Sequence, residues 1–206
     1  MIIDKLQYIS QAAADGSHLT AIEKVLRNGV QWVQLRIKDQ AEEEVLEIAG
    51  QAAELCTKYG ARLIVNDYPQ IALEVDAYGV HLGLDDMPVA EARAILGEST
   101  CIGGTANTFE DVLRRVQEGV DYIGLGPYRY TTTKKNLSPI LGLTGYETIL
   151  RQMVEAGITT PVIAIGGIEQ HDIELLYSAG VHGIALSGLL TRDNNLNAEF
   201  YVNYSR

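Results

Sequence analysis

A strand-like apolar run followed by an amphipathic stretch recurs eight times along the chain, and this alternation limits the folds available to it. The runs are apolar on both faces, which is typical of parallel strands that are covered by helices. Parallel neighbours also need a long crossover between them, and the amphipathic stretches supply it. The predicted strands are residues 6–10, 32–37, 62–67, 79–83, 101–105, 122–127, 161–167 and 183–188.

The stretches between these strands carry the start and stop signals of helices. Residues 41–60 open with a cluster of acidic side chains, which favour a helix amino terminus, and close at Gly60. Similar stretches that also end in glycine occupy residues 87–97, 108–119 and 169–180. Each glycine comes just before the next predicted strand, so the sequence marks where one unit ends and another begins.

The unit also repeats at the level of sequence. EGVDYIGLGP (118–127) and AGVHGIALSG (179–188) share a common frame, and DAYGVHLGL (76–84) is a looser version of it. A repeated β-α unit predicts a closed (β/α)8 TIM barrel. An open, doubly wound sheet is the alternative, because closure leaves no mark in the sequence. No linker or charge run divides the chain, so residues 1–206 are predicted to form a single domain.

The balance of charges narrows the range of partners. The net charge of −11 argues against nucleic-acid binding, although a local Lys/Arg cluster can still hold a small anion. The first residues, MIIDKLQYIS, are too short and polar for a signal peptide, and no apolar run reaches the roughly 18 residues of a membrane helix. Cys56 and Cys101 have no metal-binding spacing and are expected to be reduced core residues. We therefore expect a cytoplasmic protein with no nucleic-acid or membrane partner.

In a barrel of this kind the active site lies at the carboxyl ends of the strands, so the polar residues at those ends are informative. Gln34, Arg36 and Lys38 stand at the end of the second predicted strand, and their spacing of two directs them to one face, toward the mouth. Inward cations in an apolar strand are costly unless they meet an anion. The alternative partner is a carboxylate on a neighbouring strand, and both interpretations can hold together.

Acidic residues follow the next two strands. Asn66 and Asp67 close the third strand, and Asp85 and Asp86 follow the fourth. Two carboxylates on one rim, beside an arginine and a lysine, fit a Mg²⁺–diphosphate site better than a general acid/base pair. The alternative for Asp85 or Asp86 is that it caps the helix that begins near Met87.

The fifth strand is followed by two polar residues with an alternative structural explanation. Thr105 and Asn107 come just before the helix that is expected to start at Thr108, and either could cap it. The four histidines have no metal-ligand spacing and no serine or cysteine has a visible base partner, so covalent catalysis is not predicted.

Three of the remaining loops are candidates for phosphate binding. Gly166-Gly167 and Ser187-Gly188 follow the last two strands, where glycine lets backbone N–H groups approach an anion. The alternative is that these glycines serve turn geometry only. Residues 124–136, GLGPYRYTTTKKN, end a strand in hydroxyl and lysine side chains, which indicates either a solvated turn or a loop that grips phosphate.

Eight stretches spread over nearly the whole chain carry a resemblance to a known family. They are VQLRIKD (33–39), IVNDYPQIA (64–72), GVHLGLDD (79–86), IGGTANT (102–108), DYIGLGPYRYTTTKK (121–135), GLTGY (142–146), PVIAIGGI (161–168) and GIALSG (183–188). In this order they resemble the thiamine phosphate synthase (thiamine-phosphate pyrophosphorylase) family. The resemblance implies a (β/α)8 barrel and a Mg²⁺-dependent transferase of thiamine biosynthesis.

The resemblance implies a role for each matched residue. Asp67 and Asp86 match the Mg²⁺ ligands. The positions that match contacts to the pyrimidine diphosphate are Gln34, Arg36, Lys38, Asn66, Thr105 and Lys134, of which Arg36, Lys38, Thr105 and Lys134 are the catalytic candidates. The positions that match contacts to the thiazole phosphate are Thr131, Thr133, Gly167, Leu186 and Ser187. Thr105 replaces a serine found in many members, Asn107 a histidine, and Tyr130 a proline.

The implied reaction joins hydroxymethylpyrimidine diphosphate to a thiazole phosphate, carboxylated or not, and gives thiamine phosphate and pyrophosphate by a dissociative mechanism. Positioning and charge stabilisation suffice for it, in line with the absence of a predicted base or nucleophile. One alternative is a thiazole tautomerase-like isomerase on a related barrel, but such relatives tend to lack the paired aspartates. Another is a non-catalytic thiamine-phosphate sensor. The sequence leaves the oligomeric state open, and a homo-oligomer is allowed.

Overall fold

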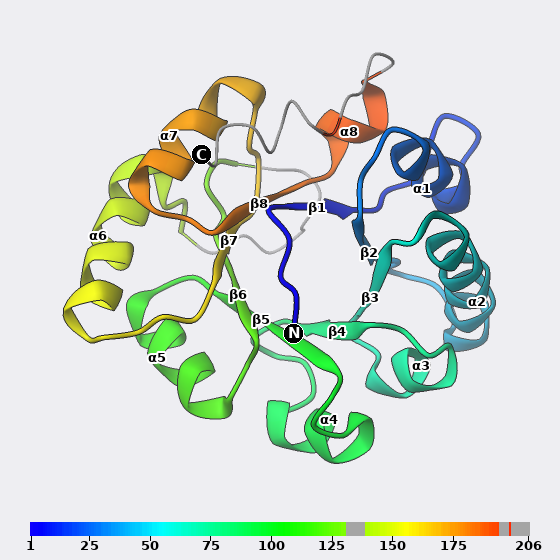
Figure 1. Cartoon of the computed structure of the whole chain (residues 1–206), viewed down its shortest axis with the longest axis horizontal. Helices are drawn as coiled ribbons and strands as arrows, with labels where there is room; N and C mark the ends of the chain where they lie inside the picture. Colours follow the sequence, from blue (N-terminus) through cyan, green and yellow to red (C-terminus); the bar gives the residue numbers. More distant parts are fainter. Residues whose placement is uncertain (131–138, 194–197, 199–206) are drawn as a thin grey trace.

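Eight parallel strands close into a barrel in the computed structural model, which describes residues 1–130, 139–193 and 198. The strands are hydrogen-bonded in chain order and β8 returns to pair with β1, as Figure 1 shows. The predicted (β/α)8 barrel is therefore confirmed, and the open sheet is excluded. The strands are β1 (Leu6–Ile9), β2 (Trp32–Leu35), β3 (Arg62–Asn66), β4 (Gly79–Leu82), β5 (Cys101–Ala106), β6 (Tyr122–Leu125), β7 (Val162–Ala164) and β8 (Gly183–Leu186).

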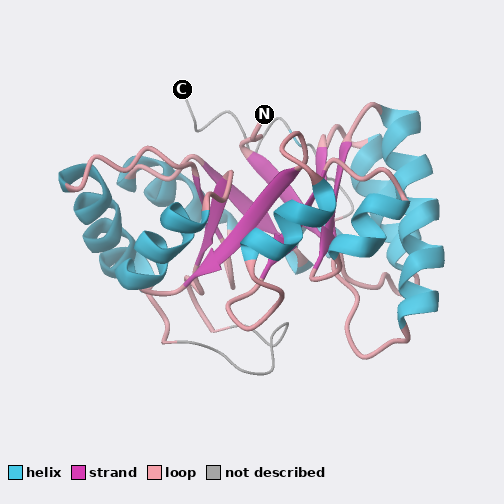
Figure 2. Ribbon diagram, turned by 90° about the horizontal axis from the view of Figure 1, so that it is seen from below, coloured by secondary structure: helices cyan, strands magenta, loops and turns pink. Residues whose placement is uncertain are grey.

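Helices form an outer ring around these strands (Figures 1 and 2). They are α1 (His18–Arg27), α2 (Glu42–Tyr59), α3 (Pro69–Glu74), α4 (Val89–Leu96), α5 (Phe109–Glu118), α6 (Gly142–Glu155), a 3-10 turn η1 (Gln170–Asp172), α7 (Ile173–Ala179) and α8 (Gly188–Arg192). The glycine stop signals are confirmed where Gly60 and Gly119 end α2 and α5 in the left-handed conformation. Within the described residues, no helix is both long and apolar enough to span a membrane.

Seven of the eight predicted strands run past the last residue that pairs in the sheet. The second was expected to reach Ile37 but ends at Leu35, and the seventh was expected to reach Gly167 but ends at Ala164. The residues beyond these ends leave the ladder and turn into the loops above the barrel. The period-two argument for Arg36 and Lys38 was therefore wrong in its premise, because both lie in the loop after β2.

The core has two parts, as expected for a barrel. A large cluster fills the space between the strands and the helices. A smaller cluster lies inside the barrel, where Trp32 packs edge-on against Tyr122 with ring centroids 5.0 Å apart. Cys101 belongs to this inner cluster and Cys56 to the outer one, and both are buried free thiols. The prediction that the two cysteines are reduced core residues is confirmed.

The tightness of the inner cluster gives a first testable expectation. A Cβ added at Gly103 would collide with the ring of Tyr122, which is fully buried and cannot move away. We expect Gly103→Ala to lower the free energy of unfolding by about 3 kcal/mol, as overpacking does in a dense core. In the matched control, Gly50→Ala, nothing lies near the added methyl group in the middle of α2, and a gain of about 0.5–1 kcal/mol is expected. Urea denaturation measures both, and equal stability of the two variants would contradict the packing argument.

Candidate functional site

The ends of β2, β3 and β4 bring two carboxylates and two cations to one rim of the barrel. Asp67 follows β3 in the left-handed conformation, with φ of 69°, and its N–H donates to His81 O of β4 at 2.9 Å. This backbone conformation is uncommon for a residue other than glycine and occurs often at functional sites. It directs the Asp67 carboxylate to the ammonium of Lys38, with which it forms an ion pair. Asp86 accepts from the N–H of Gly83 at 2.6 Å.

The two carboxylates affect each other's protonation. Burial, helped by a hydrogen bond to Asp86, raises the pKa of Asp67 to about 6. Burial also acts to raise the pKa of Asp86, but hydrogen bonds with Asp67 and the Gly83 N–H outweigh it, and the net shift is downward. Arg36 is half-buried, which lowers its pKa, and the negative charges of Asp67 and Asp86 oppose that shift. Positive charge beside this pair therefore stabilises the ionised form of both carboxylates.

This pair suits a divalent cation of the Mg²⁺ type. Two close carboxylates that compete for a proton are relieved by a cation between them, and Mg²⁺ usually takes one or two carboxylates and completes its shell with waters and substrate phosphates. Within the described ranges, no three His, Cys, Asp or Glu side chains gather around one point. The donor set therefore fits a metal that is shared with a phosphorylated ligand, and the assignment of Mg²⁺ to Asp67 and Asp86 stays a prediction.

A chain of buried polar side chains forms the floor beneath this rim. Gln34 Nε2 donates to Gln7 Oε1 at 3.1 Å, and Gln7 Nε2 donates to Tyr122 Oη at 3.3 Å. His81 then links Tyr122, which is 3.1 Å from its Nδ1, to Thr105 Oγ1, which is 3.0 Å from its Nε2. This row of hydrogen bonds crosses the interior of the barrel and joins Gln34 to Thr105, the two residues in it that were predicted to bind the pyrimidine.

Asn66 lies at the end of β3 beside this floor. Only 6% of the residue is exposed, and its Nδ2 has no hydrogen-bond partner among the described residues. A buried amide without a partner costs about 1–3 kcal/mol, so it is unusual unless a ligand satisfies it. The site therefore offers a free donor where a pyrimidine ring was expected.

The capping alternatives are wrong for the residues of the rim. Helix α4 begins after Pro88, and Asp86 bonds back to Gly83 instead. Helix α5 is capped by Thr108 in a capping box with Asp111, which leaves Thr105 in β5.

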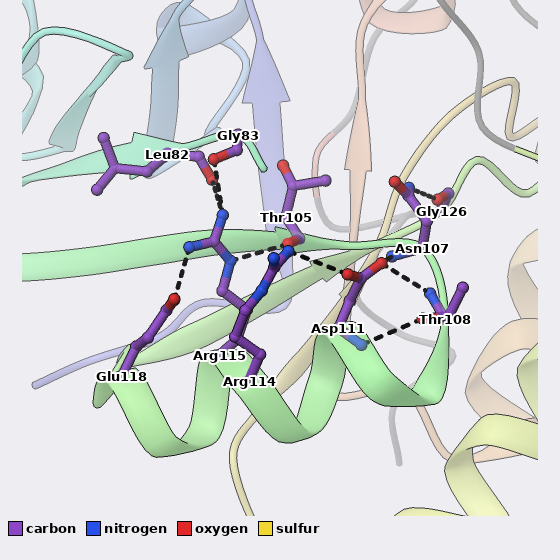
Figure 3. Close-up of polar contacts among 10 residues, drawn as sticks. All are labelled: Leu82, Gly83, Thr105, Asn107, Thr108, Asp111, Arg114, Arg115, Glu118 and Gly126. Carbon is purple, nitrogen blue, oxygen red and sulfur yellow. Dashed lines mark hydrogen bonds and ion pairs between the residues drawn. The ribbon is translucent and has the colours of Figure 1, made fainter. Parts of the chain in front are cut away.

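Asn107, which replaces a histidine found in many family members, has a structural partner. Its Nδ2 donates to the carbonyl of Gly126 at the end of β6, and its own N–H donates to Asp111 Oδ2 at 3.0 Å (Figure 3). Asn107 therefore ties the rim of β5 to the rim of β6.

The loops after β7 and β8 form the other side of the mouth. Gly166 and Gly167 have φ of 90° and 68°, and a Cβ at Gly167 would lie 2.8 Å from Tyr130 O. Turn geometry therefore does require glycine here. Ser187 follows the buried Leu186, and its buried Oγ has no hydrogen-bond partner among the described residues. This hydroxyl is available to a ligand.

The loop after β6 is described as far as Tyr130. The Arg129 side chain is held by the loop after β7. It forms a bidentate ion pair with Asp172 at 2.7 and 2.9 Å and also donates to Gly167 O at 2.9 Å. It therefore braces the loop after β7. The predicted site residues Thr131, Thr133 and Lys134 lie outside the described residues, and their roles stay predictions.

Sequence reasoning missed three residues that organise the site. His81 and Tyr122 were treated as ordinary strand residues, yet they carry the hydrogen-bond chain to Thr105. Arg115 was treated as part of an amphipathic helix, yet it is buried beneath the rim. A signal was present for Arg115: it lies three residues after Val112, on the face of α5 that points to the core.

The fold and the site together define a class of (β/α)8 barrel with paired carboxylates and cations at its carboxyl rim, an arrangement that suits a phosphorylated ligand. The comparisons with known proteins narrow this class. Residues 6–190 match the family model for thiamine monophosphate synthase. The chain belongs to this family.

Individual relatives support the assignment along the full length. A thiamine-phosphate synthase of Flavobacterium psychrophilum is 48% identical over 192 residues, which cover 93% of each chain. One from Bacteroides fragilis is 51% identical over 185 residues, which cover 90% of this chain and 91% of the relative. Among solved structures, thiamine phosphate pyrophosphorylase from Pyrococcus furiosus superposes with a TM-score of 0.81 at 28% identity and covers 97% of this chain and 96% of its own.

Proposed function

We propose that this protein is a transferase that joins hydroxymethylpyrimidine diphosphate to a thiazole phosphate and releases pyrophosphate, which yields thiamine phosphate. The observation that carries the proposal is the cluster of Lys38, Arg36, Asp67 and Asp86 on one rim. It combines the cations that neutralise a diphosphate with carboxylates that suit its metal ion. The family relationship supplies the substrates.

The pyrimidine diphosphate is assigned to the side of the mouth formed by β2 to β5. Gln34 and Thr105, at the two ends of the polar floor, and Asn66 beside it carry amide and hydroxyl groups, which suit the nitrogen atoms of an aminopyrimidine. Lys38 and Arg36 lie at the rim, where the diphosphate would extend. Mg²⁺, held by Asp67 and Asp86, would neutralise further charge on the diphosphate.

The thiazole phosphate is assigned to the loops after β7 and β8. Ser187 Oγ and the backbone of Gly167 and Leu186 are the described groups that suit it. Its phosphate would then anchor the thiazole beside the pyrimidine, with the ring nitrogen facing the methylene carbon. Holding two reactants in this way removes much of the entropic cost of their encounter.

The chemistry needs no side chain that exchanges a proton with the reacting atoms. The bond from the methylene carbon to the diphosphate oxygen breaks, and Arg36 and Lys38 stabilise the departing pyrophosphate as its charge grows. The aminopyrimidine delocalises the resulting cation. The thiazole nitrogen then donates its electron pair to the methylene carbon, and the new C–N bond completes thiamine phosphate.

Incubation with both substrates and Mg²⁺ tests the proposal. Thiamine phosphate and one equivalent of pyrophosphate should form together. Exchange between thiazole isomers without pyrophosphate would instead identify an isomerase, and tight binding of thiamine phosphate without turnover would identify a sensor. We also propose a cytoplasmic location and small phosphorylated molecules as the only substrates, and size measurements in solution would establish whether the protein forms a homo-oligomer.

The assignment of Ser187 gives a separate expectation. Loss of a hydrogen bond to a charged group costs about 1.5–3 kcal/mol, so Ser187→Ala should raise the KM for the thiazole phosphate at least about tenfold. The KM for the pyrimidine diphosphate should stay unchanged. Ser178→Ala, on the exposed face of α7, is the control and should leave both values unchanged. Steady-state kinetics with each substrate varied would measure the effect, and equal changes in both KM values would argue against the assignment.

A further inference from the structure

Arg115 of α5 is buried beneath the rim, with only 3% of the residue exposed. A buried guanidinium is costly unless its N–H groups are satisfied. Its ion pair with Glu118, at 2.7 Å, satisfies only Nη1 and lies toward solvent, since the Glu118 side chain is 31% exposed. An ion pair of this kind could form on the helix surface and gives no reason to bury the arginine.

The other nitrogens of Arg115 explain its position. Nε donates to Thr105 O at 3.0 Å, and Nη2 donates to Gly83 O at 2.6 Å and Leu82 O at 3.4 Å. Figure 3 shows the guanidinium between these carbonyls, which come from two neighbouring strand ends. The pairing of β4 with β5 stops at Leu82 and Gly104. Arg115 thus links β4 and β5 by hydrogen bonds just beyond the point where their backbone pairing ends.

Both groups that Arg115 holds belong to the proposed site. The N–H of Gly83 donates to the Asp86 carboxylate at 2.6 Å, so the place of this carboxylate depends on Gly83. Thr105 presents its hydroxyl from the segment whose carbonyl Arg115 binds. We propose that Arg115 is a positioning residue that fixes Asp86 and Thr105 relative to each other without touching substrate. This inference rests on the proposed function.

The neighbour of Thr105 shows that the fold makes room for this arginine. A Cβ at Gly104 would lie 2.8 Å from Cδ and 2.9 Å from Nε of Arg115. The long side chain can give way, whereas the backbone cannot. Gly104→Ala should therefore displace the guanidinium while the charge stays in the protein, which provides a second way to test its position.

The test compares Arg115→Met with two matched variants. Arg114→Met removes the neighbouring arginine, whose side chain is 49% exposed, and Glu118→Gln removes only the ion pair. The probe is Mn²⁺ with inorganic pyrophosphate, and free Mn²⁺ is measured by electron paramagnetic resonance. We expect Arg115→Met to weaken Mn²⁺ binding about tenfold or more, as is usual when the support of a metal ligand is removed. Both controls should stay within about twofold of the wild type.

Further readouts separate positioning from stability and from charge. Arg115→Met should raise the KM for the pyrimidine diphosphate but not for the thiazole phosphate, because only the first lies over β4 and β5. Arg115→Lys keeps a charge but cannot reach carbonyls on both strands, so it should bind Mn²⁺ as weakly as the methionine variant. If Arg115→Met does not fold, Gly104→Ala should show the same loss of Mn²⁺ affinity.

Several outcomes would overturn the inference. Wild-type Mn²⁺ affinity in a folded Arg115→Met or Gly104→Ala variant would show that the arginine only stabilises the fold. Full recovery by Arg115→Lys would show that charge, and not the contact with two strands, is what matters. Failure of the proposed function is recognised separately, because the wild type would then form no thiamine phosphate.

Discussion

Asp67→Asn is expected to lower turnover about 10²-fold or more. The substitution keeps the size of the side chain and the preference for the left-handed backbone, since asparagine tolerates φ of 69° as aspartate does. What it removes is the negative charge that pairs with Lys38 and, with Asp86, provides the carboxylate pair. Charge stabilisation during departure of pyrophosphate is the main source of catalysis in the proposed reaction, and losses of this size follow when such a group is removed.

Asp76→Asn is the matched control for this variant. Asp76 also has a left-handed backbone, with φ of 51°, but it lies between α3 and β4, at the end of the barrel away from the mouth. It should retain wild-type turnover. Rates are measured by pyrophosphate release at several Mg²⁺ concentrations, and added Mg²⁺ should partly restore Asp67→Asn. Near-wild-type turnover of Asp67→Asn at low Mg²⁺ would remove Asp67 from the metal site.

Arg36→Met should have an effect of similar size, about 10²-fold, and mainly on kcat. Arg36 is half-buried in the field of Asp67 and Asp86, where its charge is less screened than at the surface. The interaction with the diphosphate strengthens as negative charge develops on the leaving group, so its loss weakens the transition state more than the bound substrate.

Single-turnover measurements show whether the chemical step is the one affected. Arg27→Met is the control, because Arg27 lies on the outer surface of α1 in an exposed i,i+4 pair with Glu23. That variant should react at the wild-type rate. A large rise in KM for the pyrimidine diphosphate with unchanged kcat would mean that Arg36 only binds substrate and would argue against its catalytic role.

The architecture could be predicted from the sequence because three independent patterns agreed. They are the strand-like runs that are apolar on both faces, the helix stop signals at Gly60 and Gly119, and the repeated unit. All three indicated parallel strands in chain order. Closure was inferred from repetition alone and is confirmed by the pairing of β8 with β1. Rim positions of Asp67, Asp86 and Ser187 followed directly from the strand order.

What could not be predicted depends on contacts between distant segments. The ends of the strands were placed too far along, since local composition does not show where a residue loses its partner on the next strand. Capping of α5 was assigned to Thr105 or Asn107, whereas the cap is Thr108, which pairs with Asp111 in a capping box. The role of Arg115 depends on the carbonyls of Leu82 and Gly83, which lie more than 30 residues away in the sequence, and the residues around Arg115 do not predict these contacts.

The polar floor of the barrel links side chains from five strands. Gln34 donates to Gln7, Gln7 donates to the phenol oxygen of Tyr122, and His81 joins that phenol to the Thr105 hydroxyl through its two ring nitrogens. A neutral imidazole between two hydroxyls donates through one nitrogen and accepts through the other, and the two tautomers exchange these roles. The hydroxyl at the mouth can therefore offer a ligand either a proton or a lone pair, and the ligand that binds there sets the orientation of the hydrogen bonds down to Tyr122.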